Sequence, residues 1–529
     1  MKKRYINIFS LITAINIFLV LHIESSGNIR DGIEQNHIRQ FSWWDIVLLV
    51  CIYLGAYFVT LWFTERGKPF LQYKFEHYCL GGKRWSERRL FMGSFILIFM
   101  IWFFFFLVMY PGTAMNDTIY LLENPEKLCN QHPVLYILYT YCFYRIGVVL
   151  GNPNFGLALL SLVQMLAMDY VVSYAIMVLY RKSVAVWFCS LLSCYFSFAP
   201  LFSTYAVSAI KDTPFSIALF YLVILLWEMA DSKGEQLKNL VFCVKCMISV
   251  GVMSAFRSNG LPIVVCTFIL LFWFYKRYRK KVILSFLFPI GIALLLGRCL
   301  MPEGVEKSFQ ESVGIPLQQI GAVVAHEEEM TVEQTDYLYR VLPKEDWKQY
   351  APSCADNLKW NEDFDGKYLN ETKEKFLRIW LELMPEHLLT YMEAYIMNTY
   401  GIWGIETRNS EQYYIKDIWQ NELGLYQDSP LPAPIRDFFY RIYCNRFTYR
   451  YLSAGTAFWV LLMITLFGLY KGYYRYVIAF SPAWLCFLSL MASTPIAFAF
   501  RYVFFMALLF PFLLIMPFLY DTKGMLTRQ

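Results

Sequence analysis

Long apolar segments recur along this chain, and they constrain its fold more than any other feature. Residues 90–110, for example, are apolar over about the twenty positions that an α-helix needs to cross a bilayer core of roughly 30 Å. Hydrophobic residues make up 57% of the 529 and charged residues only 17%, which excludes a soluble multidomain protein. The sequence therefore predicts an all-α polytopic membrane protein.

The charges are segregated along the chain. Residues 301–450 contain 25 of the 41 acids but only 15 of the 47 bases, so the basic excess lies in the short loops elsewhere. Short basic loops between apolar segments are typical of the cytoplasmic side of a membrane protein. We therefore expect membrane lipid, and no nucleic acid, among the partners of the positive charge.

About twelve transmembrane helices are predicted, with both chain ends in the cytoplasm. The first is an uncleaved anchor that ends at Leu21, and the others lie at roughly 45–64, 90–110, 155–180, 184–202, 214–230, 240–256, 261–275, 282–299, 451–470, 476–492 and 498–520. This divides the chain into an N-terminal membrane region (1–299) with an outer loop at 111–151, a mainly α extracytoplasmic domain between the ninth and tenth spans (300–450), and a C-terminal membrane region (451–529).

Residues 133–150 are also apolar enough to span, and the choice decides the topology of everything that follows. If they span, the basic clusters near 181, 276–281 and 471–475 and the tail with Lys523 and Arg528 fall outside the cell. If they lie in the outer interface, these clusters all fall inside, as the positive-inside rule requires. We therefore predict an interfacial helix here.

Several polar residues lie on the outward connections, where ionisable side chains near membrane depth are costly and so are candidates for function. These candidates are Asp117, His132, Lys211, Asp212, Arg257, Asn259, Arg501 and Tyr502. Ordinary roles compete with this hypothesis: either Asp could cap a helix, His132 could be a packing residue and Lys211 could extend toward the interface. His326 and the three Glu after it are interpreted as a solvated turn, and no metal site is assigned.

Three motifs resemble those of the GT-C superfamily of polytopic glycosyltransferases. The first is Asp117 followed by His132-Pro-Val-Leu-Tyr136, similar to the outer loop of the protein O-mannosyltransferase and aminoarabinose-transferase branches, with Val134 in place of a second Pro. The second is Arg257-Ser-Asn-Gly260, and the third is Arg501-Tyr502. The segments around Trp380, 385–387, 391–395 and 400–403 also resemble an uncharacterised bacterial group regarded as sugar transferases.

The resemblance implies inverting transfer of a sugar from a polyprenyl-phosphate donor to a glycan, lipid or protein acceptor of the cell envelope. Asp117 would be the general base, while Lys211, Arg257 and Arg501 would stabilise the leaving phosphate and the other candidates would bind substrate. The site would face outward from a bacterial cytoplasmic membrane. No cofactor is certain; a divalent metal is left open, since Asn116 rather than a second carboxylate adjoins Asp117.

Two other classes of function remain open. In a transporter or flippase of lipid-linked glycans, the same Arg residues would line a path and no residue would act as a base. The absence of an obvious two-half repetition and the large acidic outer region argue against this class. In a polymerase or ligase of surface polysaccharide, catalysis would lie near His326 or His387, and Asp117 would be dispensable.

Overall fold

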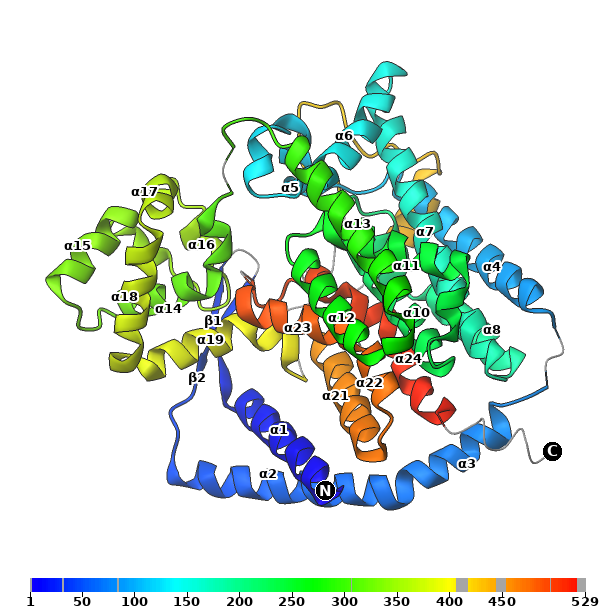
Figure 1. Ribbon diagram of the computed structural model, residues 1–529. Helices are drawn as coiled ribbons and strands as arrows, with labels where there is room; N and C mark the ends of the chain where they lie inside the picture. The colour runs from blue at the N-terminus through cyan, green and yellow to red at the C-terminus, as the bar shows by residue number, and fades with distance from the viewer. Residues whose placement is uncertain are drawn as a thin grey trace.

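The computed structural model describes residues 2–30, 33–82, 85–305, 307–405, 417–443, 453–494 and 496–520. Within these ranges the chain is mainly helical, as the sequence predicts, and its one regular sheet is a two-stranded antiparallel hairpin of β1 (Ile23–Arg30) and β2 (Ile33–Ile38). Lys523 and Arg528 of the predicted cytoplasmic tail lie outside the described residues. Figure 1 shows a large helical body with a smaller helical lobe beside it, at the left of the view.

Eight helices of the described chain are long and apolar enough to cross a membrane. A ninth span is possible if α8 (Val186–Phe198) and α9 (Pro200–Ala206), which meet at a 60° bend, cross together. The eight are α1 (Lys2–His22), the continuous helix of α2 (Trp43–Trp62), η1 (Phe63–Gly67) and α3 (Lys68–Tyr78), α4 (Glu87–Val108), α7 (Pro153–Arg181), α10 (Asp212–Asp231), α13 (Arg279–Cys299) with the η4 turn (Lys276–Tyr278), α21 (Ala454–Lys471), and α24 (Phe504–Leu519) with η9 (Phe500–Val503).

Three of the twelve predicted spans correspond to shorter helices. Segments 240–256, 261–275 and 476–492 become α11 (Leu240–Phe256), α12 (Gly260–Phe274) and the pair α22 (Tyr474–Ala479) and α23 (Ser481–Ser493). At 1.5 Å per residue, the fifteen residues of α12 extend about 22 Å, less than a bilayer core of roughly 30 Å. The helices α11 and α12 have the predicted lengths of 17 and 15 residues, and only segment 476–492 is divided, between Ala479 and Ser481.

Side-chain caps begin several of these helices. Ser86, Asn152, Asn239 and Ser453 precede α4, α7, α11 and α21, and each accepts a hydrogen bond from a backbone N–H two or three residues later. Such caps satisfy donors that the first helical turn leaves unpaired. Gly472, with φ of 78°, ends α21 in the left-handed conformation that favours glycine.

The helix α10 forms the centre of the large body. Its side chains are buried along almost the whole length, from Asp212 to Ala230. It packs against α7, α11, α22, α23 and α24, which surround it in Figure 1. A helix that is apolar on all sides is expected at the centre of a bundle, so the sequence of α10 accounts for its place.

The smaller lobe contains α14 to α18 and has a hydrophobic core of its own. Trp347, Leu358 and Phe376 are buried in this core. The lobe continues into α19, whose last turn returns to the large body, where Trp403 O accepts hydrogen bonds from Trp459 Nε1 (3.1 Å) and Asn16 Nδ2 (2.9 Å). Its helices are η5 (Phe309–Ser312), α14 (Gly314–Ala325), α15 (Val332–Val341), η6 (Asp346–Gln349), α16 (Asp356–Lys359), α17 (Gly366–Glu371), α18 (Lys373–Glu386) and α19 (Leu388–Trp403).

The segment 417–443 does not join this lobe but lies along the large body. Its backbone N–H groups at Trp419 and Asp428 donate to Ala114 O (2.8 Å) and Tyr110 O (2.9 Å). It ends in α20 (Ala433–Tyr443), which packs on α4. The described residues of the predicted domain 300–450 therefore fall into two parts. Residues of the first part form the lobe, and residues 417–443 lie against α4 and the loop that follows it.

The loop after α4, which the sequence predicts to lie outside, contains α5 (Asn116–Glu123), η2 (Lys127–Asn130) and α6 (Val134–Val149). The sixteen residues of α6 would extend about 24 Å, so it is too short to cross a membrane unaided. Its position in the outer interface stays a prediction.

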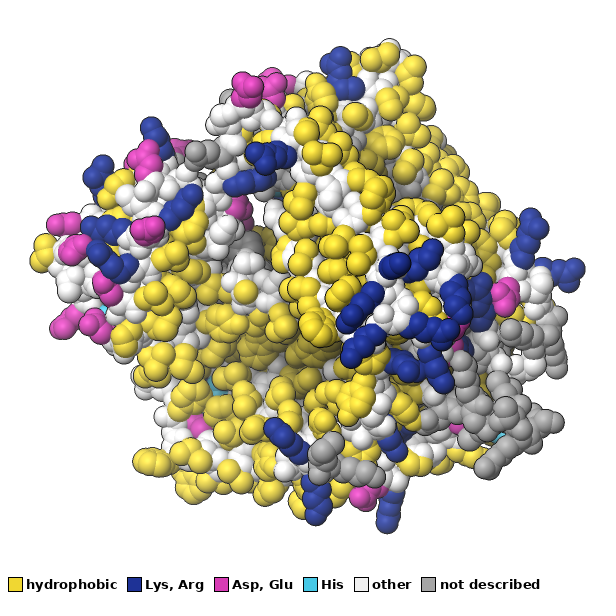
Figure 2. All heavy atoms as spheres, in the orientation of Figure 1, with side chains coloured by type: hydrophobic (Ala, Val, Ile, Leu, Met, Phe, Trp, Pro, Cys, Tyr) yellow, Lys and Arg dark blue, Asp and Glu magenta, His cyan; other side chains and the backbone are white. Residues whose placement is uncertain are grey.

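Basic side chains gather at one end of the body. Arg181 ends α7, Arg279 begins α13 and Lys471 ends α21. Lys182 pairs there with Asp231 at the end of α10, which the turn η3 (Glu235–Lys238) follows. Figure 2 shows Lys and Arg side chains clustered over this end, whereas the smaller lobe carries acidic side chains together with Lys and Arg. The basic excess of the short loops is therefore gathered in one region, while the lobe carries both signs.

Candidate functional site

The loop after α4 is held against the turn that precedes α10. The Thr113 backbone donates to Val207 O (3.0 Å) and accepts from the Ala209 N–H (2.8 Å). Gly112 permits this close approach, because its φ of 121° favours glycine and a Cβ there would lie 2.8 Å from Val207 O. The loop consequently brings Asp117, in the first turn of α5, to the beginning of α10.

The break between α11 and α12 presents Arg257. Gly260 allows this sharp break, because a Cβ at this position would lie only 1.8 Å from Met253 O at the end of α11. The guanidinium of Arg257 lies 5.2 Å from the ring centre of Phe215 and 5.0 Å from that of Tyr502. Both distances suit a cation over an aromatic ring, so the break and the two rings fix the direction of this side chain.

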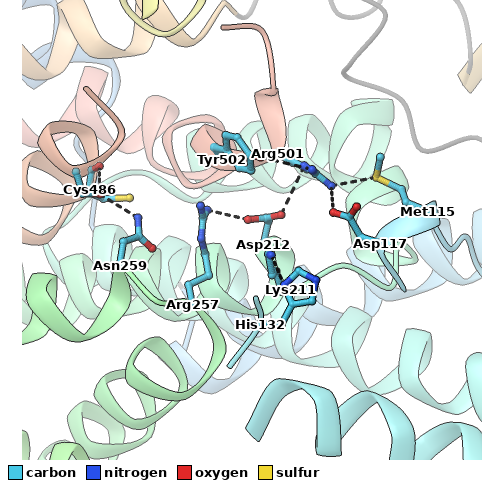
Figure 3. A network of polar contacts seen from close by, with 11 residues as sticks. Met115, Asp117, His132, Lys211, Asp212, Arg257, Asn259, Cys486, Arg501 and Tyr502 are labelled. Atoms are coloured by element: carbon cyan, nitrogen blue, oxygen red, sulfur yellow. Dashed lines mark hydrogen bonds and ion pairs between the residues drawn. The ribbon is translucent and has the colours of Figure 1, made fainter. Parts of the chain in front are cut away.

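Four of these side chains form a line of alternating charges (Figure 3). Arg501 Nη1 donates to Asp117 Oδ2 at 2.8 Å, and Arg501 Nε lies 3.9 Å from Asp212 Oδ2. On its other side, Asp212 Oδ1 lies 2.7 Å from Arg257 Nη1. Each Asp stands in the first turn of its helix, where the helix dipole favours a negative charge. Arg501 therefore connects two carboxylates that come from separate loops.

The two carboxylates differ in exposure. The side chain of Asp117 is 36% exposed, whereas that of Asp212 is 1% exposed. Neither oxygen of Asp212 receives a well-directed hydrogen bond from the described residues, although Arg257 is close. Asp212 is thus a buried counter-charge with hydrogen-bonding capacity left over, and Asp117 is the carboxylate that another molecule can reach.

His132 and Lys211 meet beside this line. Lys211 Nζ lies 2.7 Å from His132 Nδ1, close enough to donate a hydrogen bond to the imidazole. Lys307 holds the loop that carries His132, because its ammonium donates to the backbone oxygens of Cys129 (2.8 Å) and His132 (3.0 Å). The segment between α13 and η5, which carries Lys307, therefore also supports the site.

The charge states follow from burial and from these neighbours. Arg501 and, more weakly, Lys211 lower the pKa of Asp117 to about 2, against the opposing effect of burial. Burial, together with the charge of Lys211, lowers the pKa of His132 to about 3. Burial lowers the pKa of Lys211 to about 8. At pH 7 Asp117 is therefore ionised, His132 is neutral, and Lys211 is mostly charged.

A small cavity lies among these groups. The space open to the centre of a water molecule is about 10 Å3, roughly enough for one water. A molecule larger than water must therefore open this site in order to enter it. The cavity is lined by Asp117, Thr118, Leu121, His132, Tyr136, Ile210, Lys211, Asp212 and Arg501.

The net charge of the site suits an anion. Lys211, Arg257 and Arg501 supply three positive charges against the two carboxylates of Asp117 and Asp212. One positive charge is left in surroundings where electrostatic interactions are stronger than in water. Within the described chain, no group of three or more His, Cys, Asp or Glu side chains converges as a metal site would require.

The structure brings together seven of the eight residues that the sequence singles out. Asp117, His132, Lys211, Asp212 and Arg501 line the cavity, and Arg257 and Tyr502 lie directly beside it. Asn259 lies apart in Figure 3, and its amide donates to Ser489 Oγ on α23 at 2.9 Å. Neither Asp makes a side-chain cap: Met115 and Lys211 occupy the cap positions of α5 and α10.

Residues other than the eight candidates also touch the site, among them Tyr136, Phe215 and Met115. Tyr136 lines the cavity, Phe215 contacts Arg257, and Met115 Sδ lies 3.6 Å from Arg501 Nη1. Tyr136 is the last residue of the motif that begins at His132, so this motif could have indicated its place in the site. Phe215 and Met115 lie in ordinary apolar sequence, so nothing in the sequence distinguishes them.

Comparison with known proteins places the chain in a family. One family, described as a family of unknown function and designated DUF6020, matches residues 38–528, which is nearly the whole chain. The chain belongs to this family. No curated protein and no solved structure matches it.

In this member of the DUF6020 family, every connection that contributes to the cavity lies within the matched range. The connections are those after α4, before α10, between α11 and α12, and before α24. Chemically, the arrangement can bind an anion through two guanidinium groups and an ammonium group. It also presents one exposed carboxylate next to that anion.

Proposed function

We propose that the chain is a GT-C-type glycosyltransferase of the bacterial cytoplasmic membrane. It moves a sugar from a polyprenyl-phosphate donor to an envelope glycan, lipid or protein on the outer face. The observation that carries the proposal is a cavity lined by Lys211, Arg501 and the partly exposed carboxylate of Asp117, with Arg257 directly beside it. These residues come from connections far apart in the chain. Cations next to a departing phosphate stabilise its charge, and a nearby carboxylate can take a proton.

In the proposed reaction, the acceptor hydroxyl attacks the anomeric carbon and its proton passes to Asp117. The bond between the anomeric carbon and the phosphate oxygen breaks at the opposite face, so the configuration inverts. The polyprenyl phosphate leaves with the electron pair of that bond. Arg501, Lys211 and Arg257 stabilise the negative charge on the phosphate as it develops.

Arg501 also explains how a carboxylate of low pKa can act as a base. While Arg501 is paired with Asp117, the pKa of Asp117 is about 2 and the carboxylate is a weak base. A phosphate that enters the cavity competes for the same guanidinium. Loss of that partner raises the pKa of Asp117, so binding of the donor prepares the base.

The proposed topology has twelve spans, with the cavity facing outward. The segregation of basic side chains supports this orientation, because Asp212 begins α10 at the cavity and Asp231 ends it beside the basic cluster. In this topology the shorter helices α11, α12 and α23 also cross the membrane, and the residues that flank each of them complete the span. The lobe and the segment 417–443 bind the acceptor or close over the cavity.

The test is mass spectrometry of envelope glycans and lipid-linked sugars in cells that lack the chain. The cells are complemented with wild type, Asp117→Asn, or Glu123→Gln at matched abundance in the membrane. Glu123 is an exposed residue at the other end of α5, so its variant controls for loss of a carboxylate on the same helix. We expect Asp117→Asn to lower transfer about 100- to 10,000-fold and a polyprenyl-phosphate sugar to accumulate.

Full restoration of the glycan by Asp117→Asn would overturn the proposal. A lipid-linked glycan trapped on the inner face would instead indicate a flippase. The polymerase or ligase class is tested with His387→Ala. His387 donates to Glu329 O at 2.9 Å and pairs with Glu328 at 2.7 Å within the lobe. Loss of polymer in that variant alone would favour this class.

A further inference from the structure

A second cavity of the described chain lies far from the candidate site. It has a volume of about 520 Å3 and an almost entirely apolar lining, and it lies between α1, the helix α2–η1–α3, α21 and α24. Its wall includes Phe9, Trp62, Met463 and Leu514. Trp62 and Leu514 are 58% and 46% exposed, so the cavity is a groove that opens to the side of the helices.

The groove lies at the basic end of the spans. Its residues come from the first turns of α1 and from the last turns of α21 and α24. On α24, Leu514 follows Arg501 by thirteen residues, which places it about 20 Å farther along the helix. On α21 the lining runs from Val460 to Tyr470, or about 15 Å, which is half of a hydrocarbon core of roughly 30 Å. The groove therefore has the depth of one leaflet.

Positive charges border the end of the groove that meets the headgroup region. Lys471 Nζ lies 5.6 Å from the ring centre of Tyr470, and Lys68 Nζ lies 4.4 Å from that of Phe467, a ring that also lines the groove. Lys3 and Arg4 directly precede Tyr5, which lines the groove on α1. The exposed Glu65 is the acid nearest in sequence on η1. The basic excess attracts an anionic headgroup.

We infer that this groove binds an anionic glycerophospholipid of the basic-side leaflet, with one acyl chain along α21 and α24 and the phosphate beside Lys471 and Lys68. The depth of one leaflet matches an acyl chain and is too short for the tail of a polyprenyl phosphate. The π-helical segment η1 lies in the wall through Phe63 and Thr64. Such segments occur often at functional sites, because the extra residue per turn displaces the side chains.

The test is native mass spectrometry of the full chain released from nanodiscs. Delipidated protein is titrated with phosphatidylglycerol or with phosphatidylethanolamine of the same acyl chains. We expect one phosphatidylglycerol per chain, retained about 5-fold or more over phosphatidylethanolamine, and near-equal retention in Lys471→Glu. Lys280→Glu, an exposed charge on α13 at the same end, is the matched control and should keep the preference.

Two variants that fill the groove test whether the lipid binds there. Leu514→Trp and Met463→Trp should each remove the retained lipid, whereas Leu295→Trp, at an exposed position of α13, should not. An unchanged lipid count in both filling variants would overturn the inference. So would equal retention of the two phospholipids by wild type, or tighter retention of a polyprenyl phosphate. The readout is lipid binding, so the result is independent of whether the chain transfers sugars.

Discussion

Arg501 is the side chain on which the candidate site most depends. Its guanidinium contacts both carboxylates, at 2.8 Å from Asp117 and 3.9 Å from Asp212, and it is 15% exposed. A planar fork of donors can hold two partners in this way, whereas the ammonium of Lys acts as a point charge. The residue therefore couples the exposed carboxylate to the buried one.

We expect Arg501→Gln to lower kcat of sugar transfer about 100- to 1000-fold, because the leaving phosphate loses a donor and a charge. Arg501→Lys should recover part of this loss, since it restores the charge without the fork. The measurement is single-turnover transfer with a polyprenyl-phosphate sugar. Recovery of the full rate by Lys would show that geometry at this position is unimportant.

For the proposed transferase, we expect the pH dependence of donor binding to depend on Lys211. Its pKa is lowered to about 8, so the ammonium loses its charge as the pH rises through this value. We expect KM for the donor to rise above about pH 8 while kcat changes less. In Lys211→Arg the charge persists, and this limb of the profile should move above pH 10. A wild-type KM that stays flat from pH 7 to 10 would contradict this role.

At the scale of elements, the break between α11 and α12 controls where Arg257 points. A Cβ at Gly260 would lie 1.8 Å from Met253 O and 3.2 Å from the Phe215 ring, so the start of α12 would have to move. Arg257 precedes this start by three residues and lies over the same ring. The glycine of the Arg-x-x-Gly motif thus sets the direction of Arg257 indirectly, by allowing the backbones of α11 and α12 to approach closely.

We expect Gly260→Ala to destabilise the chain by about 1–3 kcal/mol and to weaken donor binding. Gly251→Ala is the control, because on α11 its Cβ would meet only Pro289, at an ordinary 3.7 Å, and alanine favours the helix. Thermal unfolding in detergent and donor affinity are both measured. Equal behaviour of the two variants would mean that the close approach at Gly260 does not constrain the break.

At the scale of the whole molecule, the separation of charges makes the topology testable. A membrane-impermeant maleimide applied to intact cells should label Glu333→Cys on the lobe and leave Lys280→Cys unlabelled until the cells are permeabilised. Both positions are exposed, and background from the native cysteines is subtracted with the wild type. The reverse pattern would place the candidate cavity on the inner face and would remove the basis for an outward-facing transferase.

Much of the fold could be predicted from local properties of the sequence. Helical content, the eight long apolar helices and the basic ends follow from segment length, composition and charge. The hairpin β1–β2 could not be predicted, because the polar segment that forms it has no alternating strand pattern. Contacts with distant residues hold the hairpin in place; for example, Glu393 accepts a hydrogen bond from the Ile38 N–H at 3.0 Å. The division of segment 476–492 into α22 and α23 depends on where that helix breaks and packs.

By itself, the sequence determined the class of the molecule and which polar residues stand at the ends of its apolar segments, because both are local. Only the tertiary structure decided that Asp117 pairs with Arg501, 384 residues away, that Asp212 is buried between two guanidinium groups, and that Asn259 turns toward α23. It also decided that four helices leave an apolar groove at the basic end. Ion pairs and grooves depend on how distant segments pack, and no local pattern records that packing.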